Sequence, residues 1–161
     1  MTNSAAAAET SVEVATVFQL GYASAASKPF TGDELTELLS KARRKNSVLG
    51  VTGILLYHEG SFIQILEGDQ GTVETLYSTI AADSRHVDAM LLFRVESTDR
   101  AFDQWTMGFH HLTNGPTDTP PAGLSRFLET GASGITSEDG DKIRDVLLGF
   151  REGRWRRTVD Y

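Results

Sequence analysis

Gln64 is the residue of this sequence whose type and position point most directly to chemistry. It lies in the segment Ser-Phe-Ile-Gln-Ile-Leu-Glu-Gly at 61–68, which has the composition of a strand. Strand alternation places Gln64 on the same side as Phe62 and Leu66, and two isoleucines on the other side. Because both sides are apolar, Gln64 is expected to be buried. A buried amide without partners costs about 1–3 kcal/mol, so a polar group must meet it inside the protein.

Tyr22 and Asn46 are two further polar residues in apolar surroundings. Tyr22 lies on one side of an alternating segment, and Asn46 continues the apolar stripe of a helix by one turn. Each of them alone is best explained as a core residue with an ordinary partner. Together with Gln64, they supply the donors and acceptors that the polar edge of one heteroaromatic ligand requires. The three residues therefore favour a ligand site between a sheet and its helices.

The elements that carry these residues follow the order β-α-β-β-α-β-β. Alternating apolar residues predict strands over 14–24, 50–57, 61–67, 89–95 and 105–109. A capping box formed by Thr31 and Glu34 opens the first helix, and an apolar stripe from Val73 to Ile80 marks the second. This order predicts an α+β, ferredoxin-like sandwich with two helices on one face of an antiparallel sheet.

The C-terminal part of the sequence is expected to cover the second face of the sheet. Residues 114–122 hold three of the four prolines and predict a linker, and a short helix is expected over 124–128. Ser137 caps a longer helix whose apolar stripe includes Ile143, Val146, Leu147 and Phe150. The predicted organisation is a mobile tail over 1–13, a ligand-binding domain over 14–112, and a linker with a helical cap over 113–161.

Composition and charge limit the class of function. The chain of 161 residues carries 15 Lys and Arg against 22 Asp and Glu, and its net charge of -7 argues against nucleic acid or an anionic membrane as a partner. It contains no cysteine, which excludes disulfides and thiol chemistry. The alanine-rich segment 4–9 lacks the basic and apolar regions of a signal peptide, and no apolar run has membrane-spanning length. We expect a cytoplasmic protein.

Several motifs of the predicted domain resemble the BLUF domain, a blue-light receptor module that binds a flavin. The resemblance extends from about Phe18 to Phe109, and both the order and the spacing of the motifs match. The motifs are Leu-Gly-Tyr-Ala-Ser at 20–24, Ala-Arg-Arg-Lys-Asn at 42–46, Gly-Val-Thr-Gly-Ile-Leu-Leu-Tyr at 50–57, Gly-Ser-Phe-Ile-Gln-Ile-Leu-Glu-Gly at 60–68, Asp-Ser-Arg-His at 83–86 and Trp-Thr-Met at 105–107. Segment 147–155 is similar to the C-terminal end of short, single-domain members.

The resemblance implies roles for residues around a bound flavin. Tyr22 and Gln64 match the photoactive pair beside the flavin N5 and O4, and Asn46 matches an asparagine that hydrogen-bonds the ring edge. Asp83 and Arg85 are expected to contact the pyrimidine carbonyl or the ribityl chain. The expected flavin-binding residues are Tyr22, Ser24, Leu39, Lys45, Asn46, Gln64, Asp83 and Arg85. For the Lys45 ammonium, however, solvent is the favoured environment. FAD is the expected form, with FMN and riboflavin as alternatives.

Other residues that could do chemistry have simpler interpretations. Trp105 and Met107 are expected on one face, where both compete for the place beside Gln64, although hydrophobic cover is the favoured role of Trp105. The four histidines have no spacing that makes a common metal site, so no metal is expected. Glu67 and Asp69 lie at a strand-to-helix turn, where both are interpreted as capping or solvent-facing groups.

The expected function is that of a light sensor and not of an enzyme. On illumination Tyr22 supplies an electron and a proton, Gln64 rearranges its amide, and the last strand and C-terminal helices pass the change to a protein partner or a homo-oligomer. One alternative is a ferredoxin-like enzyme such as an acylphosphatase, which needs a glycine-flanked basic loop where residues 23–27 are Ala-Ser-Ala-Ala-Ser. The other alternative is an interaction scaffold without photochemistry. A flavin spectrum of the purified protein distinguishes the three.

Overall fold

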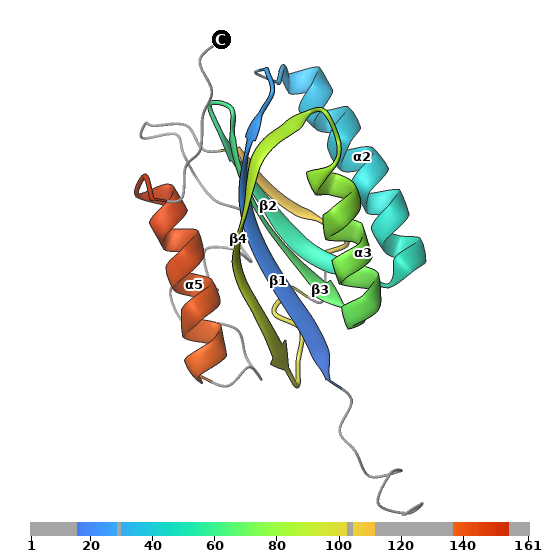
Figure 1. Ribbon diagram of the computed structural model, residues 1–161, viewed down its shortest axis with the longest axis vertical. Helices are drawn as coiled ribbons and strands as arrows, with labels where there is room; N and C mark the ends of the chain where they lie inside the picture. The colour runs from blue at the N-terminus through green and yellow to red at the C-terminus, as the bar shows by residue number, and fades with distance from the viewer. Residues whose placement is uncertain (1–15, 29, 103–104, 112–136, 155–161) are drawn as a thin grey trace, which may run out of the picture.

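The computed structural model describes residues 16–28, 30–102, 105–111 and 137–154. A five-stranded sheet lies at its centre, with the strand order β4-β1-β3-β2-β5 (Figure 1). The strands are β1 (Val17–Ala26), β2 (Thr52–His58), β3 (Ser61–Gly68), β4 (His86–Ser97) and β5 (Gly108–His111). The helices within the described residues are α2 (Gly32–Leu49), α3 (Gln70–Ala81) and α5 (Ser137–Arg151). The predicted α+β, ferredoxin-like architecture is confirmed.

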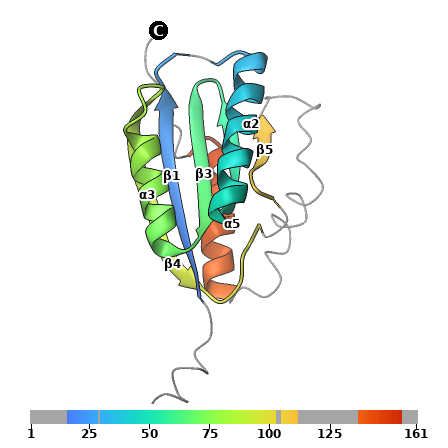
Figure 2. The same ribbon diagram turned by 90° about the vertical axis from the view of Figure 1, so that its right-hand side faces the viewer.

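Helices cover both faces of this sheet. The pair α2 and α3 lies on one face and α5 on the other, as Figures 1 and 2 show from two directions. The core on the α5 side contains Ile54, Leu56, Ile63, Ile65, Phe93, Phe102, Ile143, Val146, Leu147 and Phe150. Because the last four residues belong to α5 and are all buried, the predicted cover of the second face by a C-terminal helix is confirmed.

Local sequence signals account for the ends of α2 and α3. Thr31 Oγ1 accepts a hydrogen bond from the Glu34 main-chain N–H at 3.1 Å, and Glu34 Oε1 accepts one from the Thr31 N–H at 2.8 Å. This is the predicted capping box. Gly50 ends α2 with a φ of 71°, which glycine adopts without a side-chain clash. Asp69 caps α3, since its carboxylate accepts from the Thr72 N–H at 3.1 Å.

The last strand differs from the prediction. The sequence predicts an antiparallel strand over 105–109, but β5 begins at Gly108 and runs parallel to β2. Residues 105–107 precede β5 and pass from one face of the sheet to the other. Trp105 packs against the α5 core, whereas Met107 belongs to the core beneath α2 and α3. The expectation that these two side chains share one face is therefore wrong. Gly108 permits the packing, since a Cβ there would lie 2.6 Å from the Trp105 ring.

Three predicted segments lie outside the described residues. They are the tail over 1–13, the linker over 114–122 and the short helix over 124–128. The domain boundaries at 13/14 and 112/113 therefore stay predictions. None of the helices in the described part of the chain is long and apolar enough to cross a membrane.

Candidate functional site

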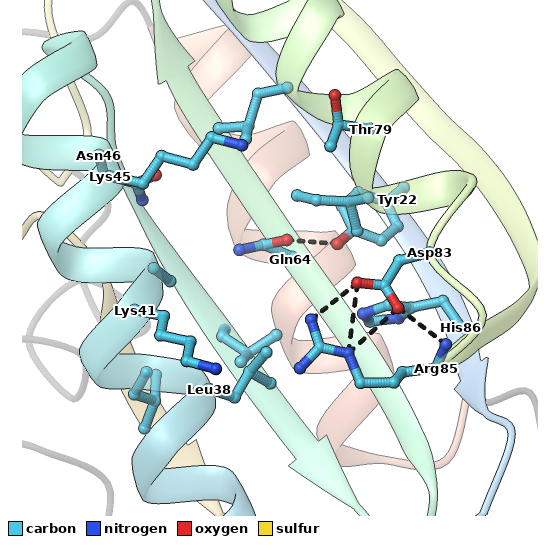
Figure 3. Close-up of a pocket in the computed structure, with 15 residues that line it drawn as sticks. Tyr22, Leu38, Lys41, Lys45, Asn46, Gln64, Thr79, Asp83, Arg85 and His86 are labelled. Atoms are coloured by element: carbon cyan, nitrogen blue, oxygen red, sulfur yellow. Dashed lines mark hydrogen bonds and ion pairs between the residues drawn. The ribbon is translucent and has the colours of Figure 1, made fainter.

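A cleft opens between α2, α3 and the sheet face that they cover (Figure 3). The empty space that it encloses is about 810 Å³, part of which is continuous with solvent. Its apolar walls consist of Leu38, Leu39, Ala42, Leu55, Leu76 and Ile80. Its polar lining consists of Tyr22, Lys41, Lys45, Asn46, Gln64, Thr79, Asp83, Arg85 and His86. The predicted ligand site between sheet and helices therefore corresponds to an actual cleft.

Tyr22 and Gln64 lie next to each other in the sheet floor of this cleft. They are direct cross-strand neighbours in the pairing of β1 with β3, and they are only 1% and 6% exposed. The Tyr22 hydroxyl donates a hydrogen bond to Gln64 Oε1. Burial, with an added effect of the nearby Tyr77, raises the pKa of Tyr22 far above its ordinary value. The phenol thus keeps its proton across the physiological pH range and directs it at the amide oxygen.

Two amides of the cleft also contact the residues that precede β5. Gln64 Nε2 donates to Met107 Sδ at 3.4 Å, and Asn46 Nδ2 donates to the Thr106 carbonyl oxygen at 2.7 Å. Arg43 adds a third contact, since its Nε donates to the Met107 carbonyl oxygen at 2.9 Å. A carboxamide has two N–H donors and one oxygen, so Gln64 and Asn46 can each serve a ligand as well. Any ligand that reorients either amide therefore acts directly on residues 106–107.

Asp83 and Arg85 form an ion pair at the rim of the cleft. Arg85 Nη2 donates to Asp83 Oδ2 at 2.7 Å, and Arg85 Nε donates to both carboxylate oxygens. These hydrogen bonds lower the pKa of Asp83 to about 2. Because the folded-state pKa is depressed, the stabilisation is complete above the ordinary carboxyl pKa of 3.8 and is lost as the pH falls through about 2. Both side chains are partly exposed, so the pair orients Arg85 more than it stabilises the fold.

Ser24 is a predicted site residue that does not line the cleft. Its Oγ lies 3.0 Å from His86 Nδ1, and both residues are buried. His86 lines the cleft and Ser24 lies behind it, so a contact of Ser24 with the flavin stays a prediction. Burial lowers the pKa of His86, which favours the neutral imidazole. Nothing in the sequence spacing pairs these two residues, because β1 and β4 come together only in the folded sheet.

Trp105 also lies away from the cleft. Its ring stacks on Phe102 with 6.1 Å between ring centroids and 12° between ring planes, on the α5 side of the sheet. Met107 occupies the place beside Gln64. The cleft includes two further polar residues, Lys41 and Thr79, which the sequence analysis missed because exposed polar positions on helices carry no signal. Among the described residues, no three His, Asp or Glu side chains gather in a way that could hold a metal ion.

The lining of the cleft fits a flat aromatic ring with one polar edge. Apolar side chains from α2 and α3 can contact the ring, while the amides of Asn46 and Gln64 meet an edge of carbonyl and N–H groups. The pyrimidine part of a flavin has such an edge. Fold and cleft together define a class of protein, namely a ferredoxin-like α+β domain with a buried tyrosine–glutamine pair in the floor of a cleft between the sheet and two helices.

The chain belongs to the BLUF family. The family model described as "Sensors of blue-light using FAD" matches residues 17–108, which include both strands of the Tyr22–Gln64 pair. The resemblance noted in the sequence is therefore confirmed, together with flavin as the cofactor and blue-light sensing as the function of the family. Because this is a family of sensors, it agrees with the expectation that the domain is not itself an enzyme.

Known proteins with similar sequences carry this domain as a small part of a longer chain. Photoactivated adenylate cyclase subunit beta of Euglena longa is 36% identical over 93 residues, which are 57% of this chain and 11% of that protein. The blue light- and temperature-regulated antirepressor BluF of Escherichia coli is 39% identical over 79 residues, 49% of this chain and 20% of that protein. This chain thus spans between a tenth and a fifth of these two relatives.

A solved structure described as the BLUF part of BlrP1 matches nearly from end to end. It has a TM-score of 0.70 and 32% identity, and the match covers 88% of this chain and 95% of that chain. A longer BlrP1 structure, from Klebsiella pneumoniae and described with FMN and cyclic diGMP, has a TM-score of 0.69 and 31% identity over 85% of this chain and 35% of that one.

Proposed function

We propose that this protein is a blue-light receptor whose cleft holds the ring of FAD between α2 and α3. The observation that carries the proposal is the buried hydrogen bond from Tyr22 to Gln64 in the floor of the cleft between the sheet and the two helices. Asn46 and Arg85 would hydrogen-bond the polar edge of the ring, and Leu39 would contact its face. The exposed Lys45 would remain at the mouth, where its ammonium stays hydrated.

Tyr22 and Gln64 are the residues proposed to respond to light. When bound, the flavin supplies absorption of blue light and an excited state that accepts an electron. Tyr22 gives an electron and the proton of its hydroxyl, and both return to it, so no net oxidation occurs. While the hydroxyl proton is displaced, Gln64 Oε1 lacks its donor. The amide then rotates or tautomerises, and this changes which donor or acceptor it presents to Tyr22 and to Met107.

The proposed output begins at residues 106–107. A rearranged Gln64 amide loses the present Nε2–H donor to Met107 Sδ, and a ligand-dependent shift of Asn46 changes the contact with Thr106. The sheet and α5 would then present a different surface to a protein partner or to a second copy of the chain in the cytoplasm. A change of this kind signals only if the partner binds the two states with different affinity.

A phosphate-transferring enzyme of the same fold is the main rival, and the first strand argues against it. Such an enzyme needs main-chain N–H groups directed at a phosphate after the strand. Here the N–H of Ala26 donates to the Gly60 carbonyl oxygen at 2.8 Å, and that of Ser27 donates to the Arg85 carbonyl oxygen at 2.9 Å. Both groups are therefore used within the fold. An intact Tyr22–Gln64 pair argues against a scaffold without photochemistry.

Blue illumination of the purified protein is expected to shift its flavin absorption to longer wavelength, with recovery in the dark. The chain has no cysteine, so a cysteinyl adduct cannot form and hydrogen-bond rearrangement is the available change. Absorption spectra before, during and after illumination test this, and acid precipitation tests whether the flavin is released as a noncovalent ligand. Bleaching of the visible band, or a colourless protein that takes up no added flavin, would contradict the proposal.

Asn46→Ala is expected to weaken flavin retention without abolishing the light response. The substitution removes one ring-edge hydrogen bond worth about 1 kcal/mol, which is roughly fivefold in Kd. It also removes the donor to the Thr106 carbonyl oxygen, so dark recovery should change as well. Titration of the flavin-free protein with FAD measures the Kd. Ser47→Ala, at the exposed neighbouring position of α2, is the control that should keep the wild-type Kd.

A further inference from the structure

A second buried polar group lies on the face of the sheet opposite the cleft. Glu67 is three residues beyond Gln64 on β3, so strand alternation directs it away from the cleft, and it is 0% exposed. Its cross-strand neighbours are Gln19 on β1 and Thr52 on β2. Gln19 Nε2 donates to Glu67 Oε2 at 3.0 Å, and Thr52 Oγ1 donates to Glu67 Oε1 at 2.9 Å. Glu67 is therefore neither a capping nor a solvent-facing group, and that expectation is corrected.

The same carboxylate binds the connection between β4 and β5. The main-chain N–H of Ala101 donates to Glu67 Oε2 at 2.8 Å, and that of Phe102 donates to Glu67 Oε1 at 2.6 Å. Gln19, Thr52, Glu67, Ala101 and Phe102 thus form one group, here named the Glu67 cluster. Two of its four hydrogen bonds come from main-chain N–H groups, so the cluster attaches residues 101–102 to β3, the central strand of the sheet.

The connection fastened in this way contacts both sides of the molecule. Its first part provides Phe102 and Trp105 to the core that α5 covers. Its last part provides the Thr106 carbonyl oxygen and the Met107 sulfur, which accept from Asn46 and Gln64 in the cleft. Between them, the Trp105 carbonyl oxygen accepts from the Gly53 N–H at 3.1 Å. Residues 105–107 are therefore a short covalent link from the cleft to the α5 core, and the Trp105 N–H donates to the Phe102 carbonyl oxygen at 3.0 Å.

We propose that Glu67 is a positioning residue for signal output, and this rests on the proposed light response of Gln64. With residues 101–102 fixed by the carboxylate, a displacement of Met107 is passed to Trp105 and so to the packing of α5. Without this attachment, residues 101–102 can move together with Met107, and the displacement is then absorbed by the β4–β5 connection and does not reach α5. The Glu67 cluster then determines whether the α5 side of the sheet responds to the cleft.

The chemistry of the cluster supports a role beyond stability. A carboxylate accepts at two oxygens and can serve all four donors, whereas a glutamine has one oxygen and would direct its NH₂ at N–H groups. A carboxylate is costly to bury, and an apolar residue at position 67, on the same side of β3 as Ile65, would fill the space at lower cost.

The test compares hydrogen exchange in darkness and under blue light for flavin-loaded wild type, Glu67→Gln and Thr52→Val. Both variants are expected to keep the full light-induced flavin shift, since neither residue lines the cleft. In Glu67→Gln at least one of the amides at 101 and 102 should exchange about tenfold faster in darkness, because glutamine offers one acceptor oxygen where the carboxylate offers two. The light–dark difference over 143–150 should fall at least about twofold in both variants, and further in Glu67→Gln.

Two matched controls separate positioning from general destabilisation. Thr52→Ser keeps the hydroxyl donor and should restore the wild-type difference over 143–150. Glu74→Gln removes a carboxylate that pairs with Arg94 at the surface of α3, and it should also match the wild type. If Glu67→Gln does not fold, the test rests on the light–dark exchange difference over 143–150 in Thr52→Val compared with that in Thr52→Ser.

The possible failures are distinguishable. A wild-type difference over 143–150 that persists in Glu67→Gln and Thr52→Val overturns this inference alone. Equal loss in Thr52→Val and Thr52→Ser also overturns it, because the hydroxyl is then irrelevant. A wild-type protein that shifts its flavin absorption without any difference over 143–150 overturns the proposed output through α5 and this inference together, while the light response itself stands.

Discussion

Gln64→Leu is expected to abolish the light-induced shift of the flavin absorption while the protein stays folded and keeps its flavin. Leucine fills nearly the same volume as glutamine, so packing is conserved, although the buried Tyr22 hydroxyl loses its acceptor, which costs about 1–3 kcal/mol if nothing replaces it. Its side chain has no donor for Met107 and no acceptor for Tyr22, so no exchange of hydrogen-bonding atoms can occur. Absorption difference spectra, light minus dark, measure the effect.

Gln19→Leu is the matched control for this substitution. Gln19 is also a fully buried glutamine in the central strands, but it lies on the opposite face beside Glu67. The same chemical change there should leave the flavin shift at its wild-type size. A normal shift in Gln64→Leu would refute the proposed mechanism, and loss of the shift in both variants would show that the effect comes from general damage to the sheet.

The sequence was sufficient to predict the parts of the site that depend on local patterns. The capping box at Thr31 fixes where α2 begins, and the helical period then places Asn46 on the buried stripe. The short turn before Ser61 makes β2 and β3 a hairpin, so alternation places Gln64 on the face covered by the helices. The helical and strand periods of apolar residues and the geometry of a short turn depend on residues close in sequence, so these parts of the site could be predicted.

The parts that were missed depend on contacts between distant segments. Glu67 looked like a group at a strand-to-helix turn because Gly68 follows it, yet its four donors come from β1, β2 and the β4–β5 connection. Trp105 and Met107 are two positions apart, which in a strand would place them on one face. However, β5 pairs in parallel with β2 only from Gly108 onward. A parallel pairing with so distant a strand leaves no mark on the local pattern, so the change of side at 105–107 could not be predicted.

Tyr22→Phe is expected to eliminate the light response by a different cause, the loss of the electron and proton donor. In the wild type the centroids of the Tyr22 and Tyr77 rings are 5.0 Å apart. A phenylalanine ring at position 22 can keep this contact, so the pocket should remain formed. Gln64 Oε1 loses its donor, which costs about 1–3 kcal/mol if nothing replaces it, so a lower denaturation midpoint is expected with flavin still bound. Time-resolved absorption after a blue pulse should show a longer-lived excited state and no shifted product.

Tyr77→Phe provides the control, since it makes the same chemical change on the ring that packs against Tyr22, and it should keep the full shift.

The pH dependence of the wild type adds an independent check. Burial raises the pKa of Tyr22 above the ordinary value of 10.0, so the phenol stays protonated in the folded state and the size of the shift should be constant from about pH 6 to 10. Above pH 10 the unfolded chain loses the proton first, so stability is complete below that pH and falls as the pH rises. A shift that titrates away between pH 7 and 9, or one that survives in Tyr22→Phe, would exclude the neutral Tyr22 phenol as the donor.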